Sequence, residues 1–269
     1  MDLQIVLPDE SPAVDAQRVI DLGVEAERLG YETAWLPDHL LPPRDYGETY
    51  GGVYEPLVTL TYLAARTSRI RLGTSVLVLP MRSPFVVAKQ AATLHELSGA
   101  RFVLGVGIGW DRTEFESVDA DFTTRGARTD EAIALLRHLW TSREPFQGTH
   151  YGYDQGVFEP QPRGHLRIMV GGTSDRAVAR AAALADEWQG VGVEPATFAE
   201  VAARLRNRAQ RPLRLGTRIA WSGGADELTQ VIDQAHRFAD AGADALAVWF
   251  GPAEGTEERM AEFAARMRG

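Results

Sequence analysis

The sequence alternates eight times between a short apolar run and a segment with helical spacing of apolar residues, and this order limits the fold more than any other feature. Strands are expected at residues 3–8, 33–37, 70–80, 101–109, 166–172, 186–192, 213–223 and 243–250. Helices are expected at 12–29, 56–68, 83–99, 125–140, 174–185, 195–209, 225–240 and 256–269. Eight strand–helix units in 269 residues predict an α/β fold of the (β/α)8 type, a TIM barrel, whose usual length is about 250 residues.

Local signals support these boundaries. Pro56 stands at a first helical position, and Ser83 precedes the proline that opens the helix closed by Gly99. The alternative fold, a doubly wound open sheet, fits less well because no G-x-G-x-x-G turn opens the first helix. Residues 143–166 are rich in Gly, Pro and aromatic residues and predict a β-hairpin excursion. No linker interrupts the pattern, so we expect a single domain over residues 1–269.

The composition excludes several kinds of chemistry. The chain has no cysteine, which excludes thiol nucleophiles, disulfides and Cys-ligated metal centres. Its formal net charge is -9 and it has no basic cluster, so nucleic acid is not an expected partner. No apolar run reaches the about 20 residues of a membrane span. The first residues also lack the regions of a signal peptide, so we expect a cytoplasmic protein without a membrane partner.

In a TIM barrel the active site lies at the C-terminal ends of the strands. The residues expected there are mostly small, apolar or aromatic, and the ionisable ones are Asp9, Asp38, His39 and Asp111. That set is sparse for a metal centre and poor in cations for phosphoryl transfer. We therefore expect no metal, and a flat, partly apolar ligand with one anionic end.

The segment "VGGTSDRAV" offers a place for the anionic end. Gly171 and Gly172 precede Thr173 and Ser174 at a helix start, with Arg176 in the first turn. Free backbone N–H groups, the helix dipole and an arginine together suit a phosphate. The alternative is structural: the glycines make a tight turn, Ser174 caps the helix and Arg176 is solvated. The residues alone leave both interpretations open.

The chain resembles the bacterial-luciferase-like superfamily in the segments "AERLGYETAWLPDHL", "EPLVTLTYLAARTSRIRLGTSVLVLPMRSP", "AKQAATLHELSGARFVLGVGIGWDRTEFESV", "RGARTDEAIALLRHLW" and "IMVGGTSDRAVARAAALADEW". Members of this superfamily are flavin- or deazaflavin-dependent oxidoreductases on a TIM barrel. The subgroup that the chain most resembles uses the deazaflavin coenzyme F-420, and other members use FMN. The resemblance implies hydride transfer between coenzyme F-420 and a small organic substrate.

The resemblance also assigns roles to residues at the expected barrel mouth. Asp38 and His39 match an Asp-His pair in which the aspartate lies against the cofactor ring and the histidine, the implied catalytic residue, handles a proton near the flavin N5 region. Ser75 and Val76 match a segment that often holds a non-prolyl cis peptide against the ring. The remaining implied cofactor contacts are Ile108, Gly109, Gly171, Gly172, Thr173, Ser174 and Arg176.

The chain departs from the family pattern at Trp110. The sugar-phosphate dehydrogenases of the family have a glutamate there, after "GTG", so their acid–base pair is incomplete in this chain and sugar-phosphate oxidation is not expected. Trp110 and Asp111 either wall the substrate pocket or begin a surface loop. Glu114 and Glu116 are expected on a solvated helix face.

Three other functions are alternatives to F-420-dependent hydride transfer, the first two within the resemblance and the third outside it. With FMN, the same mouth would serve a two-component monooxygenase in which the reduced flavin reacts with oxygen. A non-catalytic flavin or deazaflavin carrier would bind the cofactor without turnover. A metal-dependent hydrolase would need more ligands than the mouth offers. The resemblance further implies a flavin or F-420 reductase as the electron source, and a homodimer.

Overall fold

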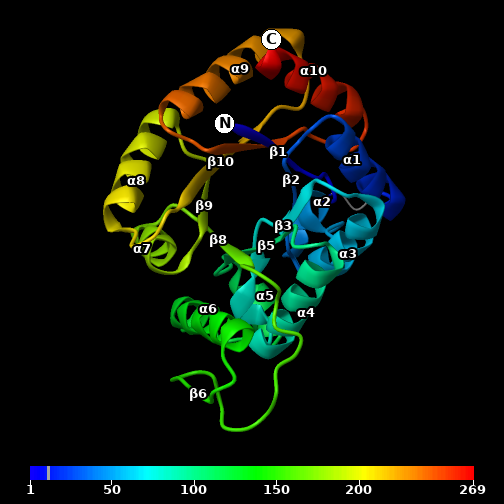
Figure 1. Cartoon of the computed structure of the whole chain (residues 1–269). Helices are drawn as coiled ribbons and strands as arrows, with labels where there is room; N and C mark the ends of the chain where they lie inside the picture. Colours follow the sequence, from blue (N-terminus) through cyan, green and yellow to red (C-terminus); the bar gives the residue numbers. More distant parts are fainter. Residues whose placement is uncertain (11–12) are drawn as a thin grey trace.

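In the computed structural model, parallel strands close into a ring with helices packed around it (Figure 1). The structure describes residues 1–10 and 13–269. The ring contains β1 (Asp2–Val6), β2 (Thr33–Leu36), β3 (Arg71–Thr74), β5 (Phe102–Gly107), β8 (Arg167–Gly171), β9 (Glu187–Val191), β10 (Arg214–Ala220) and β11 (Ala245–Trp249). β1 pairs with β11 and β3 with β5, which closes the ring. The predicted (β/α)8 barrel is confirmed.

A short strand follows β3 and extends the ring toward its C-terminal end. This strand, β4 (Leu77–Val78), pairs in parallel with the last residues of β5. Residues 75–76 lie between β3 and β4, and the Ser75–Val76 peptide bond is cis, as the resemblance implied. The third barrel strand therefore reaches the mouth in two pieces separated by this bulge.

The principal helices follow the strands in the predicted order. They are α1 (Ala16–Arg28), α3 (Pro56–Arg66), α4 (Pro84–Leu97), α6 (Arg125–Thr141), α7 (Asp175–Leu184), α8 (Pro195–Arg208), α9 (Ala225–Asp240) and α10 (Thr256–Arg268). Shorter helical segments are η1 (Arg44–Tyr46), α2 (Gly47–Tyr50), η2 (Leu79–Met81) and α5 (Arg112–Ser117). Among the described residues, no helix is long and apolar enough to cross a membrane.

Two details differ from the sequence prediction or refine it. The first helix begins at Ala16, because the Asp15 side chain accepts the N–H groups of Gln17 and Arg18 and so caps it. Its predicted start, residue 12, lies outside the described residues. The predicted hairpin is present as the antiparallel pair β6 (Phe146–Gln147) and β7 (Gly152–Tyr153), which projects from the barrel in Figure 1.

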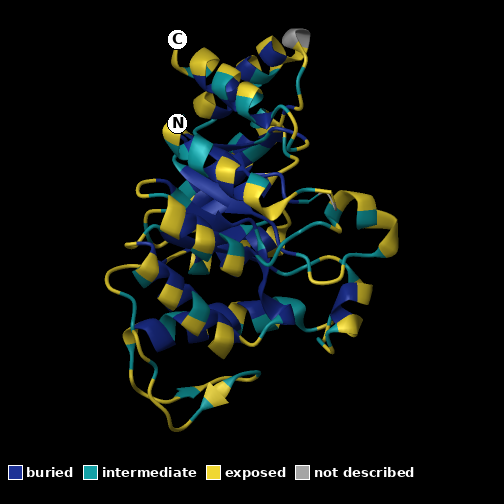
Figure 2. Ribbon diagram, turned by 90° about the vertical axis from the view of Figure 1, so that its right-hand side faces the viewer, coloured by how far each residue is buried: buried dark blue, intermediate teal, exposed yellow. Residues whose placement is uncertain are grey.

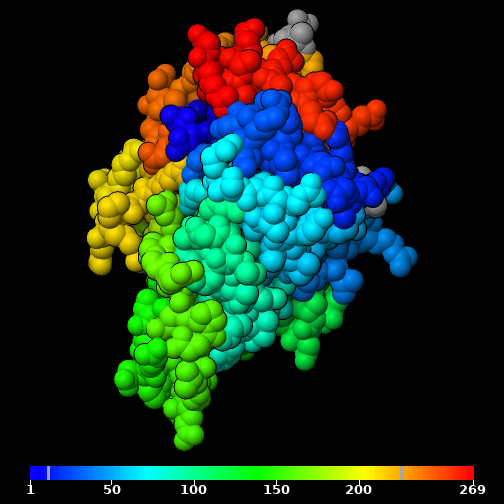
Figure 3. Space-filling view, turned by 45° about the vertical axis from the view of Figure 1, so that its right-hand side comes forward, coloured from blue at the N-terminus to red at the C-terminus, as the bar shows by residue number. Residues whose placement is uncertain are grey.

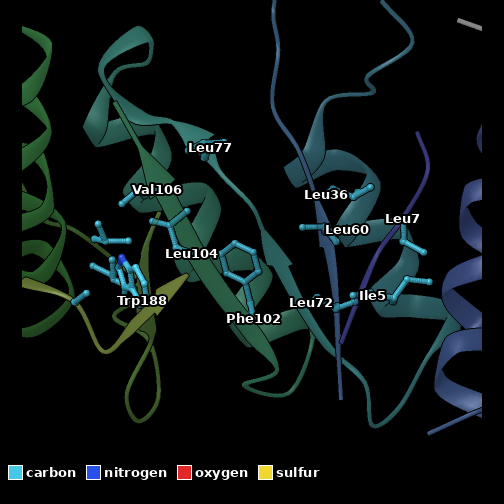
Figure 4. Close-up of a cluster of buried hydrophobic side chains, with 14 of the residues drawn as sticks. Ile5, Leu7, Leu36, Leu60, Leu72, Leu77, Phe102, Leu104, Val106 and Trp188 are labelled. Atoms are coloured by element: carbon cyan, nitrogen blue, oxygen red, sulfur yellow. The ribbon is translucent and has the colours of Figure 1, made fainter. Parts of the chain in front are cut away.

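The main hydrophobic core lies between the strands and the helices, and the strands are buried while the outer helix faces are exposed (Figure 2). Ile5, Leu36, Leu72, Phe102 and Leu104 point into this layer (Figure 4). Because side chains alternate along a strand, the residues between them point into the barrel. The N- and C-terminal segments pack together over one end of the molecule (Figure 3), where β1 pairs with the last strand.

The barrel interior is divided into layers. Its middle is an apolar cluster of Val6, Trp35, Val103, Met169 and Ala247. The Trp35 ring lies so close to β3 that a Cβ at Gly73 would be 2.2 Å from it. Glycine is therefore the residue that lets the indole fill the barrel.

The N-terminal end of the barrel is closed by ion pairs. Arg71 donates to Glu32 at 2.9 Å and to Glu187 at 2.6 Å, and Arg214 donates to Glu32 at 3.2 Å. Burial alone would raise the pKa of Glu32, but the neighbouring Arg71 and Arg214 charges outweigh burial and lower it. This end is a structural network in which the charges are already paired.

Candidate active site

The strand ends surround a cavity of about 480 Å³ at the mouth of the barrel. A hollow of about 680 Å³ lies at the opposite end, but its walls carry Asp186 and Arg214, whose charged groups are already engaged in ion pairs. The mouth therefore holds the candidate site. Of the predicted site residues, those that line it are Asp38, His39, Ser75, Val76, Ile108, Gly109, Trp110, Gly171 and Gly172. Lining residues that the sequence analysis did not assign to the site are Glu10, Pro37, Tyr50, Val78, Gly107, Glu114, Gln189, Val191 and Arg218.

His39 forms a buried pair with Glu114. The His39 Nδ1 atom lies 3.2 Å from Glu114 Oε2, and the two side chains are 10% and 4% exposed. Burial would raise the pKa of Glu114, but the hydrogen bonds from His39 and from the Leu41 and Leu40 amides lower it overall. An ionised carboxylate only accepts, so Nδ1 carries the proton and Nε2 is left to accept or donate one in the cavity.

Glu114 corrects the sequence analysis, which placed it on a solvated face. Its neighbour Glu116 is exposed as predicted, but Glu114 turns inward and accepts the N–H groups of Leu40 at 2.6 Å and Leu41 at 3.0 Å. Asp111 makes this possible, because its carboxylate accepts the Glu114 N–H at 2.7 Å and caps α5. Asp111 does not line the cavity, so it positions Glu114 rather than walling the pocket.

Aromatic rings enclose His39. The Tyr50 ring stacks on the imidazole with centroids 4.7 Å apart, and Trp110 meets it edge-on at 6.0 Å. Trp110 also meets Tyr46 edge-on at 5.2 Å, and its side chain is 51% exposed. Trp110 thus lies at the outer side of the cavity, and its role as a wall of a substrate pocket stays a prediction.

Both carboxylate oxygens of Asp38 accept hydrogen bonds from residues below the mouth. Its Oδ1 accepts from Arg82 Nη2 at 2.6 Å, and its Oδ2 accepts the Val78 N–H at 2.9 Å, with the side chain 0% exposed. Arg82 also donates to Glu55 at 3.0 Å. The carboxylate therefore holds β4 and Arg82 in place.

The floor of the cavity is built around Val76. A Cβ at Gly107 would lie 2.4 Å from one Val76 methyl group, and a Cβ at Gly171 would lie 2.7 Å from the other. Both glycines are therefore needed for Val76 to lie between β5 and β8. Beside it, the Ser75 hydroxyl donates to the Gln189 side-chain oxygen at 2.6 Å. The floor is apolar over Val76 and polar at its edge.

The predicted phosphate turn is only partly at the cavity. Gly171 and Gly172 line it, and Gly172 has a φ of 113°, which favours glycine. Ser174 caps α7 by accepting the Ala177 N–H at 3.2 Å. Thr173 and Ser174 are exposed, and Arg176 lines a separate hollow between α6 and α7. Phosphate binding by residues 171–174 stays a prediction, and the geometry favours a solvated Arg176.

Asp9, at the end of the first barrel strand, has a raised pKa. Its side chain is fully buried, and neither carboxyl oxygen has a hydrogen-bond partner within the described part of the chain. Burial, followed by the nearby Glu10 charge, raises the pKa of Asp9 from 3.8 to about 8. The Asp9 side chain is therefore largely protonated and neutral at pH 7, a pH at which an ordinary aspartate is ionised.

We expect Asp9→Asn to raise stability at alkaline pH. The unfolded carboxyl loses its proton near pH 4, whereas the folded one keeps it until about pH 8, so the wild-type protein loses stability as pH rises across that window. The full shift corresponds to an upper limit on the order of 6 kcal/mol. Thermal melts from pH 4 to pH 9 measure it, with the exposed Asp233→Asn as control. Parallel curves for wild type and Asp9→Asn would contradict the assignment.

A TIM barrel whose mouth cavity holds a paired imidazole and carboxylate has the arrangement of an enzyme active site. The sequence model of the luciferase-like monooxygenase family matches residues 1–268. The chain therefore belongs to this family and is an enzyme of the luciferase-like type, as the resemblance implied.

Relatives in this family include dehydrogenases and monooxygenases. The chain is 34% identical over 201 residues to an uncharacterized protein of Mycobacterium tuberculosis, covering 70% of this chain and 69% of that protein. It is 36% identical over 170 residues to an F420-dependent glucose-6-phosphate dehydrogenase of Nakamurella multipartita, covering 62% and 49% of the two chains. It is 32% identical over 200 residues to the pyrimidine monooxygenase RutA of Cronobacter sakazakii, covering 71% and 59%. The chain thus spans about half the length of the dehydrogenase.

Solved structures agree on the fold. An F420-dependent secondary alcohol dehydrogenase in complex with an F420-acetone adduct superposes with a TM-score of 0.83 at 16% identity, over 100% of this chain and 99% of that one. The monooxygenase RslO1 from Streptomyces bottropensis superposes with a TM-score of 0.79 at 19% identity, over 100% and 99%. At these identities the similarity establishes the barrel and its closure.

Proposed function

We propose that the chain is a coenzyme F-420-dependent oxidoreductase that transfers hydride between the deazaflavin and a small organic substrate. The observation that carries this proposal is the buried His39–Glu114 pair beside an apolar floor. The F420-dependent relatives support the choice of cofactor.

The residues of the cavity fit a flat ring system. Val76 presents its methyl groups between two glycines, where any Cβ would collide with it. Gly109 has a φ of 74°, and a Cβ there would lie 2.6 Å from Phe115. Ser75 and Gln189 supply polar atoms at one edge, and Ile108 lines the same wall. We infer that a ring would lie on Val76, with residues 171–174 nearest to a phosphate-bearing tail.

When bound, a deazaflavin supplies a ring carbon that gives or accepts a hydride. His39 would donate or accept the proton that the substrate gains or loses in the same reaction, through Nε2. Glu114 holds Nδ1 protonated and stabilises the imidazolium when it forms. Trp110 and Tyr50 limit the access of water to the imidazole. Asp38 and Arg82 keep the segment below the floor fixed.

An FMN-dependent two-component monooxygenase is the second candidate function. The RutA and RslO1 relatives support it, and the same cavity would bind either ring. A flavin or F-420 reductase as electron source stays a prediction, and so does the cytoplasmic location.

Paired titrations of the purified protein with F-420 and with FMN, followed by fluorescence and calorimetry, test the cofactor. We expect micromolar or tighter binding of F-420 and weaker binding of FMN. Preference for FMN would support the monooxygenase instead. Binding of F-420 without turnover of any substrate would support a non-catalytic carrier. Binding of neither would contradict the proposed function.

We also propose that the chain forms a homodimer through α3 and α4. Val58 and Tyr62 on α3, and Phe85 and Val86 on the neighbouring α4, are large apolar residues left exposed. Such clustering is typical of an interface between subunits. Sedimentation measures the mass: we expect a dimer for the wild type and a monomer for Val58→Glu with Tyr62→Glu. A monomeric wild-type protein would contradict the proposal.

A further inference from the structure

Arg218 reaches the cavity from a different wall than Val76. The strands follow one another around the barrel in the order β1, β2, β3, β5, β8, β9, β10 and β11, so β9 separates β10 from β8, the strand against which Val76 packs. Arg218 on β10 and Val76 after β3 both line the cavity. A substrate between them would face Val76, where the cofactor ring is placed, on one side, and the guanidinium of Arg218 on the other.

The guanidinium of Arg218 has fewer close partners than those of the other partly buried arginines Arg71, Arg82 and Arg101. Its side chain is 19% exposed, and its only ion pair within the described part of the chain is with Glu10, at an Nη2–Oε1 distance of 3.6 Å. That distance is too long for a hydrogen bond. By contrast, Arg101 donates to five acceptors, and Arg71 and Arg82 make close pairs with carboxylates.

The 3.6 Å separation from Glu10 leaves the N–H groups of Arg218 able to reach a ligand in the cavity. Burial raises the pKa of Glu10, and the nearby Arg218 and His39 lower it by less. Among the described residues that line the cavity, Arg218 is the one arginine, and no lysine joins it. A guanidinium has five N–H donors in a planar fork, which matches the two oxygens of a carboxylate.

We propose that Arg218 binds a carboxylate of the substrate, in competition with the nearby carboxylate of Glu10, so that the substrate is a small organic acid. This inference rests on the proposed function, since it assigns the Val76 side of the cavity to the ring of the cofactor. The carboxylate would lie on the β1–β10 side of the cavity. The rest of the substrate would then extend toward Val76 and His39, where the reaction occurs.

Calorimetric titrations with benzoate and with benzamide test the proposal. The two molecules are flat and alike in shape but differ in charge, and each is titrated into the protein with and without F-420. We expect wild type to bind benzoate about tenfold more tightly than benzamide, and Arg218→Gln to remove that preference. Glu10→Gln is expected to strengthen benzoate binding about threefold, because it removes the competing carboxylate. The exposed Arg237→Gln is the matched control and should behave as wild type.

The outcomes separate this inference from the proposed function. Equal affinities of wild type for benzoate and benzamide, while F-420 still binds, would overturn the substrate assignment alone. A large loss of F-420 affinity in Arg218→Gln would assign the guanidinium to the cofactor and also overturn it. Failure of wild type to bind F-420 would instead contradict the proposed function. Circular dichroism and thermal melts confirm that each variant is folded.

Discussion

Replacing His39 with alanine is expected to lower kcat by about 10²–10⁴-fold, the usual contribution of a positioned general acid or base. The affinity for F-420 should stay within about threefold of wild type, because the cavity floor at Val76 is unchanged. The loss follows from the geometry of the pair: Glu114 occupies Nδ1, and the variant removes Nε2, the ring nitrogen that Glu114 leaves available. Steady-state kinetics of F-420 oxidation or reduction, with fluorescence titration for the cofactor, measure the two quantities separately.

Two variants of α5 provide the companion measurement. Glu114→Gln keeps the shape and removes the charge that supports an imidazolium, so we expect an intermediate loss of kcat and a shifted pH profile. Glu116→Gln, two residues further along the same helix and exposed, should match wild type. Wild-type turnover by His39→Ala would rule out the assigned role.

Replacing Arg82 with methionine is expected to destabilise the fold by about 3–5 kcal/mol, the usual cost of removing one partner of a buried ion pair. The Asp38 side chain is 0% exposed and would keep the Val78 N–H as its close partner while losing the guanidinium. Because Asp38 precedes His39, the loss would also disturb the site. Urea denaturation followed by circular dichroism gives the free energy of unfolding.

A double variant tests whether the buried charge is the cause. Asp38→Asn combined with Arg82→Met removes both charges, so we expect it to be less destabilised than the sum of the two single variants. Additive effects, or a cost below about 1 kcal/mol for Arg82→Met alone, would mean that the pair contributes little.

The barrel could be predicted because its signal is repeated. Each strand–helix unit carries its own periodicity, so errors of a few residues at one boundary, such as the start at Ala16, leave the topology unchanged. The break that separates β4 from β3 within the strand expected at 70–80, and the short helices, lacked such support. β4 has two residues and α5 has six, too few for a helical or strand period to be visible, and they form where tertiary contacts select them.

The site was predictable where a residue lies within three positions of the end of a strand. His39, Ser75, Val76 and Ile108 do so and line the cavity. Glu114 could not be found this way, because it lies 75 residues from His39 on a short helix whose orientation depends on the Asp111 cap.

Arg218 and Gln189 were missed for another reason. Both lie inside strands, before the C-terminal ends at which a barrel active site is expected. A charged residue within the otherwise apolar run "LGTRIAW" was the available signal, since such a residue in a barrel strand must face a polar space or a partner.

The apolar layer around Trp35 and Met169 separates the two polar ends of the barrel. Mutations at one end can therefore accumulate independently of mutations at the other. Substitutions among the mouth residues can alter which molecule is bound without touching the ion pairs around Arg71 at the other end. The network there can likewise be strengthened without disturbing the reaction. A barrel with such a layer can change its substrate specificity while the ion pairs that stabilise its other end stay unchanged. This makes the mouth of this chain a favourable starting point for directed evolution.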